Sequence, residues 1–322
     1  MNSDSQNTLT IAIPTYKRPE FLLKLVKSVI RQISTNKKIS ILIVDDSTDS
    51  TNNYVYSYIA KNLKFTNISI IRNTVNLGID NNIVKCLEFS KSDYTWLVGE
   101  DDLFAGDSIE FVYNQIKFSK EPVYLCNYIY SDSKHSKLAK KSVFNELDTN
   151  ILPKRILLQN YVWAAGFIGC CLINTNKWLS SNYKIFSGTY YSHVGGILNI
   201  LNQNIPIIRK ICIKNRAEDV DTFTWSGSTF DVYFSFYDVI NKSSLSHEDK
   251  EHAKLGAQRL FKVNNLLWLI AKRADDVYNF YIYKKFYSHE NLPRRFIYFV
   301  IAFLPKFIIL PFRRLHLKSK FR

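Results

Sequence analysis

Short apolar segments alternate with helical patterns along the first hundred residues. Four segments rich in β-branched and aromatic residues begin 26 to 30 residues apart, at Leu9–Ile13, Ile39–Val44, Ile68–Ile71 and Tyr94–Val98. That interval is the length of a strand, a helix and two turns. Between the first two, apolar residues recur with helical spacing over Pro19–Gln32. The alternation predicts an α/β fold whose mostly parallel sheet is joined by right-handed crossovers.

Polar segments follow all four predicted strands, at Pro14–Arg18, Asp45–Asp49, Asn73–Asp80 and Gly99–Asp102. In open parallel sheets, ligands bind beyond the carboxyl ends of the strands. We therefore expect the four segments to converge on one ligand. The alternative for an acidic segment of this kind is a helix cap.

The residue types in these segments suit a nucleotide diphosphate. Three adjacent carboxylates at Glu100–Asp102 are hard oxygen ligands of the kind that Mg²⁺ or Mn²⁺ prefers. Asp46 is placed to accept the N–H of a base, Tyr16 offers a ring for stacking, and Arg18 offers a phosphate partner. Neither GxxxxGK[ST] nor GxGxxG occurs, so the P-loop and the dinucleotide-binding fold are excluded.

The motifs as a set resemble family 2 glycosyltransferases of the GT-A fold. They are Ile11–Pro19, Ile43–Thr51, Asn76–Ile79 and Trp96–Asp102, within about the first 110 residues. A narrower similarity is to bacterial O-antigen sugar transferases of the abequosyltransferase type. It depends on Gly99–Asp102, Ser187–His193, Asn215–Arg216 and Asp221–Phe223.

The resemblance implies inverting transfer of a sugar, with a deoxyhexose as one candidate, from a nucleotide-diphosphate donor. It implies a nucleotide-sugar site made of Pro14, Thr15, Tyr16, Arg18, Asp46, Asn76, Gly78, Glu100 and Arg216. It implies Mg²⁺ or Mn²⁺ held by Asp101 and Asp102. The family's usual D-x-D has Asp where this chain has Gly99, which implies either weaker metal binding or metal binding by Asp101 and Asp102 alone.

An inverting transferase needs a general base for the acceptor hydroxyl. The family supplies it near the start of a helix in the second half, where this chain has Ser192 and His193. We predict His193, since an ordinary imidazole pKa near 6.5 suits a base at neutral pH. Asp221 is the second predicted catalytic residue, with Glu218 and Asp219 in reserve. A structural histidine is the alternative for His193.

Asp46 also bears on the choice of donor and Arg216 on the leaving group. Uracil, thymine and guanine present a ring N–H to a carboxylate, whereas cytosine N3 does not. UDP-, dTDP- and GDP-linked donors are therefore favoured over CDP-linked ones. Arg216 is expected to stabilise the leaving diphosphate, with an ordinary surface arginine as the alternative. The resemblance implies a lipid-linked saccharide acceptor of O-antigen or surface polysaccharide.

Charge and composition indicate how the rest of the chain is organised. The 322 residues carry a net charge of +15, and residues 291–322 hold eight Lys or Arg and no acid among apolar, aromatic runs. We predict a transferase domain over 1–243 (nucleotide half about 1–130, acceptor half about 131–243), a helical appendage over 244–290 and a membrane-associating tail over 291–322. A helix packed on the body is the alternative for the tail.

Other sequence features point to the compartment and exclude some partners. Five cysteines without a CxxC pair fit free thiols in a reducing compartment, and the polar first ten residues give no secretory signal. We therefore expect a cytoplasmic protein, peripheral on the inner face of the bacterial membrane. Nucleic acid is not an expected partner. Two alternative functions are a nucleotidyltransferase and a nucleotide-sugar-binding protein without turnover.

Overall fold

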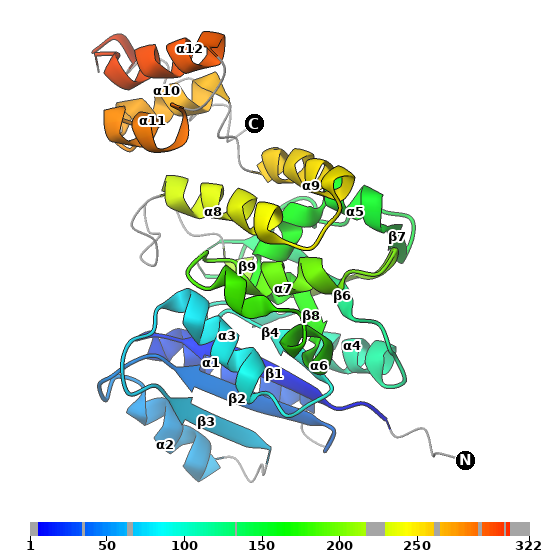
Figure 1. The fold of residues 1–322 in the computed structure, drawn as a ribbon. Helices are drawn as coiled ribbons and strands as arrows, with labels where there is room; N and C mark the ends of the chain where they lie inside the picture. The colour runs from blue at the N-terminus through cyan, green and yellow to red at the C-terminus, as the bar shows by residue number, and fades with distance from the viewer. Residues whose placement is uncertain are drawn as a thin grey trace.

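A nine-stranded mixed sheet forms the centre of the computed structural model, with helices on both faces (Figure 1). The structure describes residues 6–33, 36–62, 67–132, 134–216, 229–260, 265–288, 292–305 and 307–309. Eight strands follow the order β3-β2-β1-β4-β8-β6-β9-β5, and β7 pairs with β9. The fold is α/β, as the sequence predicted.

The amino-terminal half is a parallel sheet in which the four predicted strands are confirmed. They are β1 (Leu9–Thr15), β2 (Ile39–Asp45), β3 (Ile68–Arg72) and β4 (Tyr94–Leu97), which run parallel to one another. Every residue of β1 is buried, which explains its continuous apolar run. The crossovers are α1 (Pro19–Ile33), α2 (Asn53–Asn62) and α3 (Ile79–Phe89). The carboxyl ends of β1 to β4 share one edge of the sheet, where the polar segments begin.

The second half extends the same sheet with mostly antiparallel pairings, whereas β6 and β9 pair in parallel. Its strands are β5 (Leu103–Phe104), β6 (Val123–Ser131), β7 (Ile151–Pro153), β8 (Cys171–Asn174) and β9 (Asn204–Arg216). Its helices are α4 (Ser108–Ile116), α5 (Lys154–Asn160), α6 (Thr175–Leu179) and α7 (Ser192–Ile200), with 3-10 turns η1 (Val162–Gly166), η2 (Ile168–Cys170) and η3 (Tyr183–Phe186). β9 pairs with β6 and ends at Arg216, so it brings the second half to the edge where β4 ends.

Only the end of the apolar segment Gly166–Ile173 forms a strand. The segment forms 3-10 turns, and extended pairing begins only at Cys171. One reason is that the Gly169 carbonyl accepts a hydrogen bond from the Trp96 indole Nε1 at 2.9 Å, so it is not available to a strand ladder. A Cβ at Gly169 would also lie 2.6 Å from the Phe167 ring. The close approach of β4 therefore selects the turn.

Helices complete the chain in two groups. α8 (Thr229–Lys242) and α9 (His247–Leu260) lie against the sheet domain, whereas α10 (Leu266–Ala274), α11 (Phe280–Phe286) and α12 (Leu292–Phe303) gather at the carboxyl-terminal end (Figure 1). A side-chain cap precedes α9, since the Asp249 N–H donates to Ser246 Oγ at 3.1 Å.

α9 packs against α5, so the first helix of the predicted appendage lies on the transferase body. A Cβ at Gly256 would lie 2.0 Å from the Leu158 carbonyl oxygen, which shows how closely the two helices approach. The later helices pack on the start of α8 through aromatic rings, including Phe230 against Trp268 with centroids 5.2 Å apart. Among the described residues, no helix is long and apolar enough to cross a membrane. All five cysteines are buried free thiols.

Candidate active site

The segments after β1 and β4 are bound to each other through Glu100. Thr15 Oγ1 donates to Glu100 Oε2, and the Tyr16 backbone N–H donates to the same oxygen at 3.1 Å. Burial raises the pKa of Glu100 to about 8, despite these donors and nearby Arg18. The predicted nucleotide-site residues Thr15, Tyr16 and Glu100 therefore lie together, with the Tyr16 ring 45% exposed.

Two arginines from opposite halves of the chain meet on Asp101. Arg18 Nη1 lies 3.0 Å and Arg216 Nη2 lies 2.8 Å from Asp101 Oδ2. The Arg216 guanidinium also lies over the Phe21 ring, 4.5 Å from its centroid. The two predicted phosphate partners are thus brought together at the carboxyl edge of the sheet, beside a predicted metal ligand.

Asp102 connects the loop after β4 to the end of β9. Its Oδ1 accepts from Asn215 Nδ2 and from the Arg216 backbone N–H, both at 3.0 Å. The side chain is buried, and burial followed by the charge of Asp101 raises its pKa. A Cβ at Gly99 would lie 2.7 Å from Asp102 Oδ2. The inward position of Asp102 therefore accounts for glycine where the family pattern has Asp.

His135 is a residue of this site that the sequence did not predict. It adopts a left-handed backbone with φ of 56°, and its Nε2 lies 3.0 Å from the Asp101 carbonyl oxygen. A carbonyl only accepts, so Nε2 carries the hydrogen. Nδ1 lies 2.7 Å from Ser131 Oγ, which also lies 3.0 Å from the Asn215 carbonyl. Burial lowers the pKa of His135. No motif surrounds this histidine in the sequence, which is why it was missed.

Asp46 has a different set of contacts from those predicted. Its Oδ1 accepts from the Leu77 N–H at 2.8 Å and from Asn73 Nδ2 at 2.9 Å, and its Oδ2 accepts from the Gly78 N–H at 2.9 Å. The residue is 2% exposed. Gly78 has a φ of 77°, a conformation that favours glycine, and Asn76 Oδ1 accepts from its N–H. Asp46 therefore orders the loop that contains Asn76 and Gly78, rather than presenting open oxygens to a base.

The structure argues against His193 as the general base. The ring is 1% exposed at the start of α7, and its Nε2 donates to the Ala165 carbonyl at 3.1 Å. Burial lowers the pKa of His193 to about 4, with Asp80 opposing the shift. An imidazole enclosed in this way has no path to an acceptor hydroxyl. Asp221 and the reserve candidates Glu218 and Asp219 lie outside the described residues.

The carboxylates have the chemistry for a divalent ion but are not gathered as a finished site. Asp101 and Asp102 offer hard oxygens, and the charge of Asp101 raises the pKa of Asp102, a repulsion that a cation would relieve. Asp101 is paired with two guanidinium groups. Within the part of the chain that the structure describes, no three His, Cys, Asp or Glu side chains are grouped to hold a metal ion.

Sequence comparison assigns the family. The family model described as "Glycosyl transferase family 2" matches residues 10–180, which contain β1 from Thr10 on, β4 and the segments that follow these strands. The chain belongs to glycosyl transferase family 2. It resembles the abequosyltransferase RfbV of Salmonella typhimurium, with 29% identity over 208 residues, 60% of this chain and 61% of that protein. An uncharacterized glycosyltransferase of Rickettsia conorii is 33% identical over 144 residues, 43% of this chain and 21% of that protein. The matches thus cover less than two thirds of these relatives.

Solved structures place this family 2 chain in the GT-A fold. TarS 1–349 of S. aureus, in complex with UDP-GlcNAc, aligns with a TM-score of 0.59 and 15% identity over 79% of this chain and 73% of that one. The mannosyltransferase PcManGT of Pyrobaculum calidifontis, in complex with GDP-Man and Mn²⁺, aligns with a TM-score of 0.55 and 14% identity over 96% of this chain and 83% of that one. At this identity the similarity establishes the fold alone.

Proposed function

We propose that the chain transfers a sugar, with inversion, from a nucleotide-diphosphate donor to a lipid-linked saccharide of an O-antigen or surface polysaccharide. The observation that carries the proposal is the meeting of Arg18 and Arg216 on Asp101, at the edge where β1 and β4 end. Two guanidinium groups match the charge and the planar geometry of phosphate oxygens. The family match and the similarity to an abequosyltransferase support the reaction class and the acceptor.

The proposed donor site consists of residues at the edge of the sheet where β1 and β4 end, which we call the mouth. Tyr16 presents an exposed ring for the base, Glu100 lies beside it, and Arg18 and Arg216 face the diphosphate. UDP-, dTDP- and GDP-linked donors are preferred to CDP-linked ones because a ring N–H matches the carboxylate of Asp46. That contact requires Asp46 to exchange one of its bonds to the loop of Leu77 and Gly78 on donor binding.

Mg²⁺ or Mn²⁺ is the proposed cofactor, held by Asp101 and Asp102. When bound, the ion supplies positive charge for the leaving diphosphate. Arg18 and Arg216 would bind oxygens of the same diphosphate. Asn215 Nδ2 and the Arg216 N–H hold Asp102 in place through hydrogen bonds. The Mn²⁺ in the complex of PcManGT is consistent with this assignment.

The general base is proposed to be Asp221, with Glu218 and Asp219 in reserve. These acids follow Arg216 in the chain, and Arg216 lies at the mouth of the site. His193 is replaced in this role because its ring is enclosed. The carboxylate would accept the proton of the acceptor hydroxyl as the new glycosidic bond forms.

We propose a cytoplasmic location on the inner membrane surface, through the segment after Asn291. Within the described part of that segment, α12 exposes Leu292 (78%), Phe296 (68%) and Phe303 (54%), and Arg294 and Arg295 lie in its first turn. An apolar face next to basic residues suits an anionic lipid surface. Such an attachment would bring the active site to a lipid-linked acceptor.

Asp101→Ala provides the test of this function. UDP, dTDP, GDP and CDP are first screened by thermal shift in the presence of Mn²⁺. We expect at least one of them to raise the melting temperature of the wild type, because a ligand of the folded state raises its stability. Transfer from the nucleotide-sugar of the best nucleotide to a membrane lipid extract should fall about a hundredfold in Asp101→Ala, since the variant loses a proposed ligand of the metal ion that offsets the charge of the leaving diphosphate.

Asp107→Ala is the matched control, because Asp107 pairs with Lys210 on the surface nearby. Full activity of Asp101→Ala would contradict the site. Nucleotide binding by the wild type without any transfer or donor hydrolysis would favour the alternative of a binding protein.

A further inference from the structure

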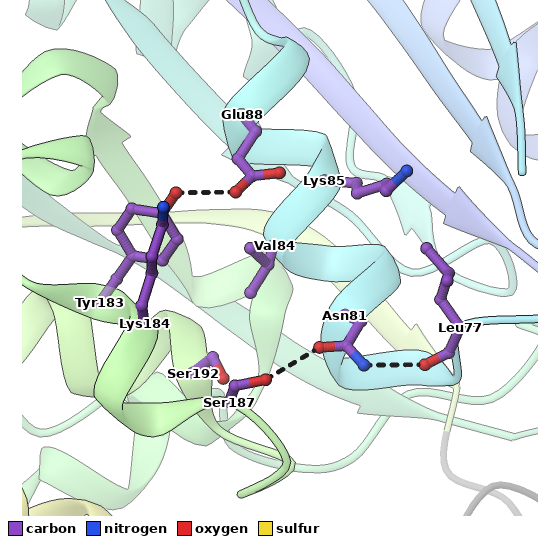
Figure 2. A pocket seen from close by; sticks show the side chains of 9 residues that line it. All are labelled: Leu77, Asn81, Val84, Lys85, Glu88, Tyr183, Lys184, Ser187 and Ser192. Carbon is purple, nitrogen blue, oxygen red and sulfur yellow. Dashed lines mark hydrogen bonds between the residues drawn. The ribbon is translucent and has the colours of Figure 1, made fainter.

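A groove separates α3 from η3 and the loop before α7 (Figure 2). Its volume is about 410 Å³, within the range of roughly 300–1,000 Å³ that is usual for small-molecule sites. One wall is a stripe of α3 and its approach, with Leu77, Asn81, Val84 and Glu88 at helical spacing. None of the residues proposed above for donor, metal or base lines this groove.

Its two walls are fixed to each other by hydrogen bonds. Asp80, buried at the start of α3, accepts from the Gly188 N–H at 2.8 Å and from the Ser192 N–H at 2.9 Å. Ser187 Oγ donates to Asn81 Oδ1 across the groove at 3.1 Å, as Figure 2 shows. The loop of residues 187–192 therefore has a defined position, and the groove is formed before any ligand arrives.

The far end of the groove is also held in place. Tyr183 OH donates to Glu88 Oε1 at 2.7 Å, and the Tyr183 ring stacks on Trp178 with centroids 4.3 Å apart. The Lys85 ammonium lies over the Phe89 ring, 5.5 Å from its centroid. Glu88 keeps acceptor capacity, because one carboxylate accepts several hydrogen bonds.

The near end of the groove is formed by Leu77, which lies between Asn76 and Gly78 of the predicted donor site. Leu77 lines the groove, and its N–H is bound by Asp46. The Asp46 N–H in turn donates to the Thr15 carbonyl at 2.9 Å, and Thr15 Oγ1 donates to Glu100. A series of hydrogen bonds thus connects Leu77, at one end of the groove, to the loop of Glu100.

We propose that this groove is the subsite for the saccharide part of the acceptor, an inference that rests on the proposed function. Apolar patches at Leu77 and Val84 alternate with the amide of Asn81, the hydroxyl of Ser187 and the carboxylate of Glu88. A sugar ring presents the same alternation of C–H faces and hydroxyl groups. A lipid chain would need an unbroken apolar lining, which these polar groups interrupt.

Val84→Trp tests the subsite by filling the groove. The probes are methyl glycosides of mannose, galactose, rhamnose and N-acetylglucosamine, followed by saturation-transfer NMR on the full chain. We expect at least one to bind the wild type and its affinity to fall at least about tenfold in Val84→Trp, equivalent to about 1.4 kcal/mol. Ile185→Trp is the control, since Ile185 is an exposed residue of η3 that does not line the groove.

Nucleotide binding, measured by thermal shift, should be the same in all three proteins. If Val84→Trp does not fold, the double variant Asn81→Ala/Glu88→Ala takes its place with the same expected loss. Saccharide binding that is absent from the wild type, or that survives both variants, would overturn the subsite. Nucleotide binding is measured separately and tests the donor site. A failure of the saccharide subsite therefore does not decide the assignment of the donor site.

Discussion

The acidic side chains at the ends of the strands differ in burial, and burial determines which groups they contact. Asp46 and Asp102 both lie at the end of a strand, as the sequence predicted, yet each is nearly enclosed and accepts from backbone N–H groups. Asp101, the residue between Glu100 and Asp102, keeps 21% of its side chain exposed and holds two arginines. Exposure therefore distinguishes Asp101, whose carboxylate contacts two cationic side chains, from Asp46 and Asp102, whose carboxylates order the loops in this structure.

His193 shows the same distinction and leads to a prediction about pH. Its pKa in the folded protein is about 4, below the ordinary 6.5, so the unfolded chain binds the proton more readily. The stability that depends on the neutral ring is present above pH 6.5 and is lost as the pH falls from 6.5 towards 4. We expect His193→Gln to remove about 1–3 kcal/mol of this dependence, measured by urea unfolding at pH 7.5 and pH 4.5.

His247→Gln is the control, because His247 lies exposed on α9. Transfer at pH 7.5 should stay within about threefold in His193→Gln, since a base contributes about a hundredfold or more. A loss of that larger size, with the fold intact, would restore His193 as the base.

At the scale of elements, the sequence predicts best where one period governs a segment. β1 to β4 and α1 follow the periods of strands and of a helix, and the structure contains all five elements that the sequence predicted from these periods. β9 was not predicted, although it ends at Asn215 and Arg216, because its partner β6 lies far away in the chain. The bond from Asp46 to Leu77 and the bond from His135 to Asp101 were not predictable for the same reason. Such contacts depend on how loops close, and no local pattern encodes them.

The contact of α9 with α5 gives a prediction about stability. A methyl group at Gly256 would overlap the Leu158 carbonyl and lie 2.9 Å from Val162 Cγ1, so the helices would have to separate. Gly256→Ala should therefore lower the free energy of unfolding by about 1–3 kcal/mol, even though alanine favours helix. Chemical denaturation measures this change.

The comparison variant is Gly106→Ala, where a Cβ meets no atom within 4 Å and only the positive φ opposes it. Its cost should be about 1 kcal/mol. If Gly256→Ala is as stable as the wild type, α9 does not pack on α5 as described, and the appendage begins at residue 244 as the sequence predicted.

At the scale of the whole molecule, the chain has two chemically different ends. The amino-terminal half holds the mouth formed by the ends of β1 and β4, whereas α10 to α12 form an aromatic cluster at the other end (Figure 1). Phe280 of α11 packs with Phe299 and Phe303 of α12, at centroid distances of 6.4 and 5.3 Å. Leu292, Phe296 and Phe303 then recur at helical spacing as an exposed apolar face.

The proposed membrane contact depends on that face, which can be changed without touching the active site. Each exposed phenylalanine that enters the lipid interface contributes about 1–2 kcal/mol, so losing two of them weakens binding by tenfold or more. We expect the wild type to sediment with phosphatidylglycerol vesicles, more weakly at high salt, and Phe296→Ser/Phe303→Ser to remain largely in the supernatant.

The double variant Phe111→Ser/Phe118→Ser is the control, since both residues are exposed near α4, far along the chain. Equal sedimentation of both variants would show that α12 does not bind lipid. Binding of the wild type to phosphatidylcholine alone, with no effect of salt, would remove the basic residues from the proposal and leave only the apolar face.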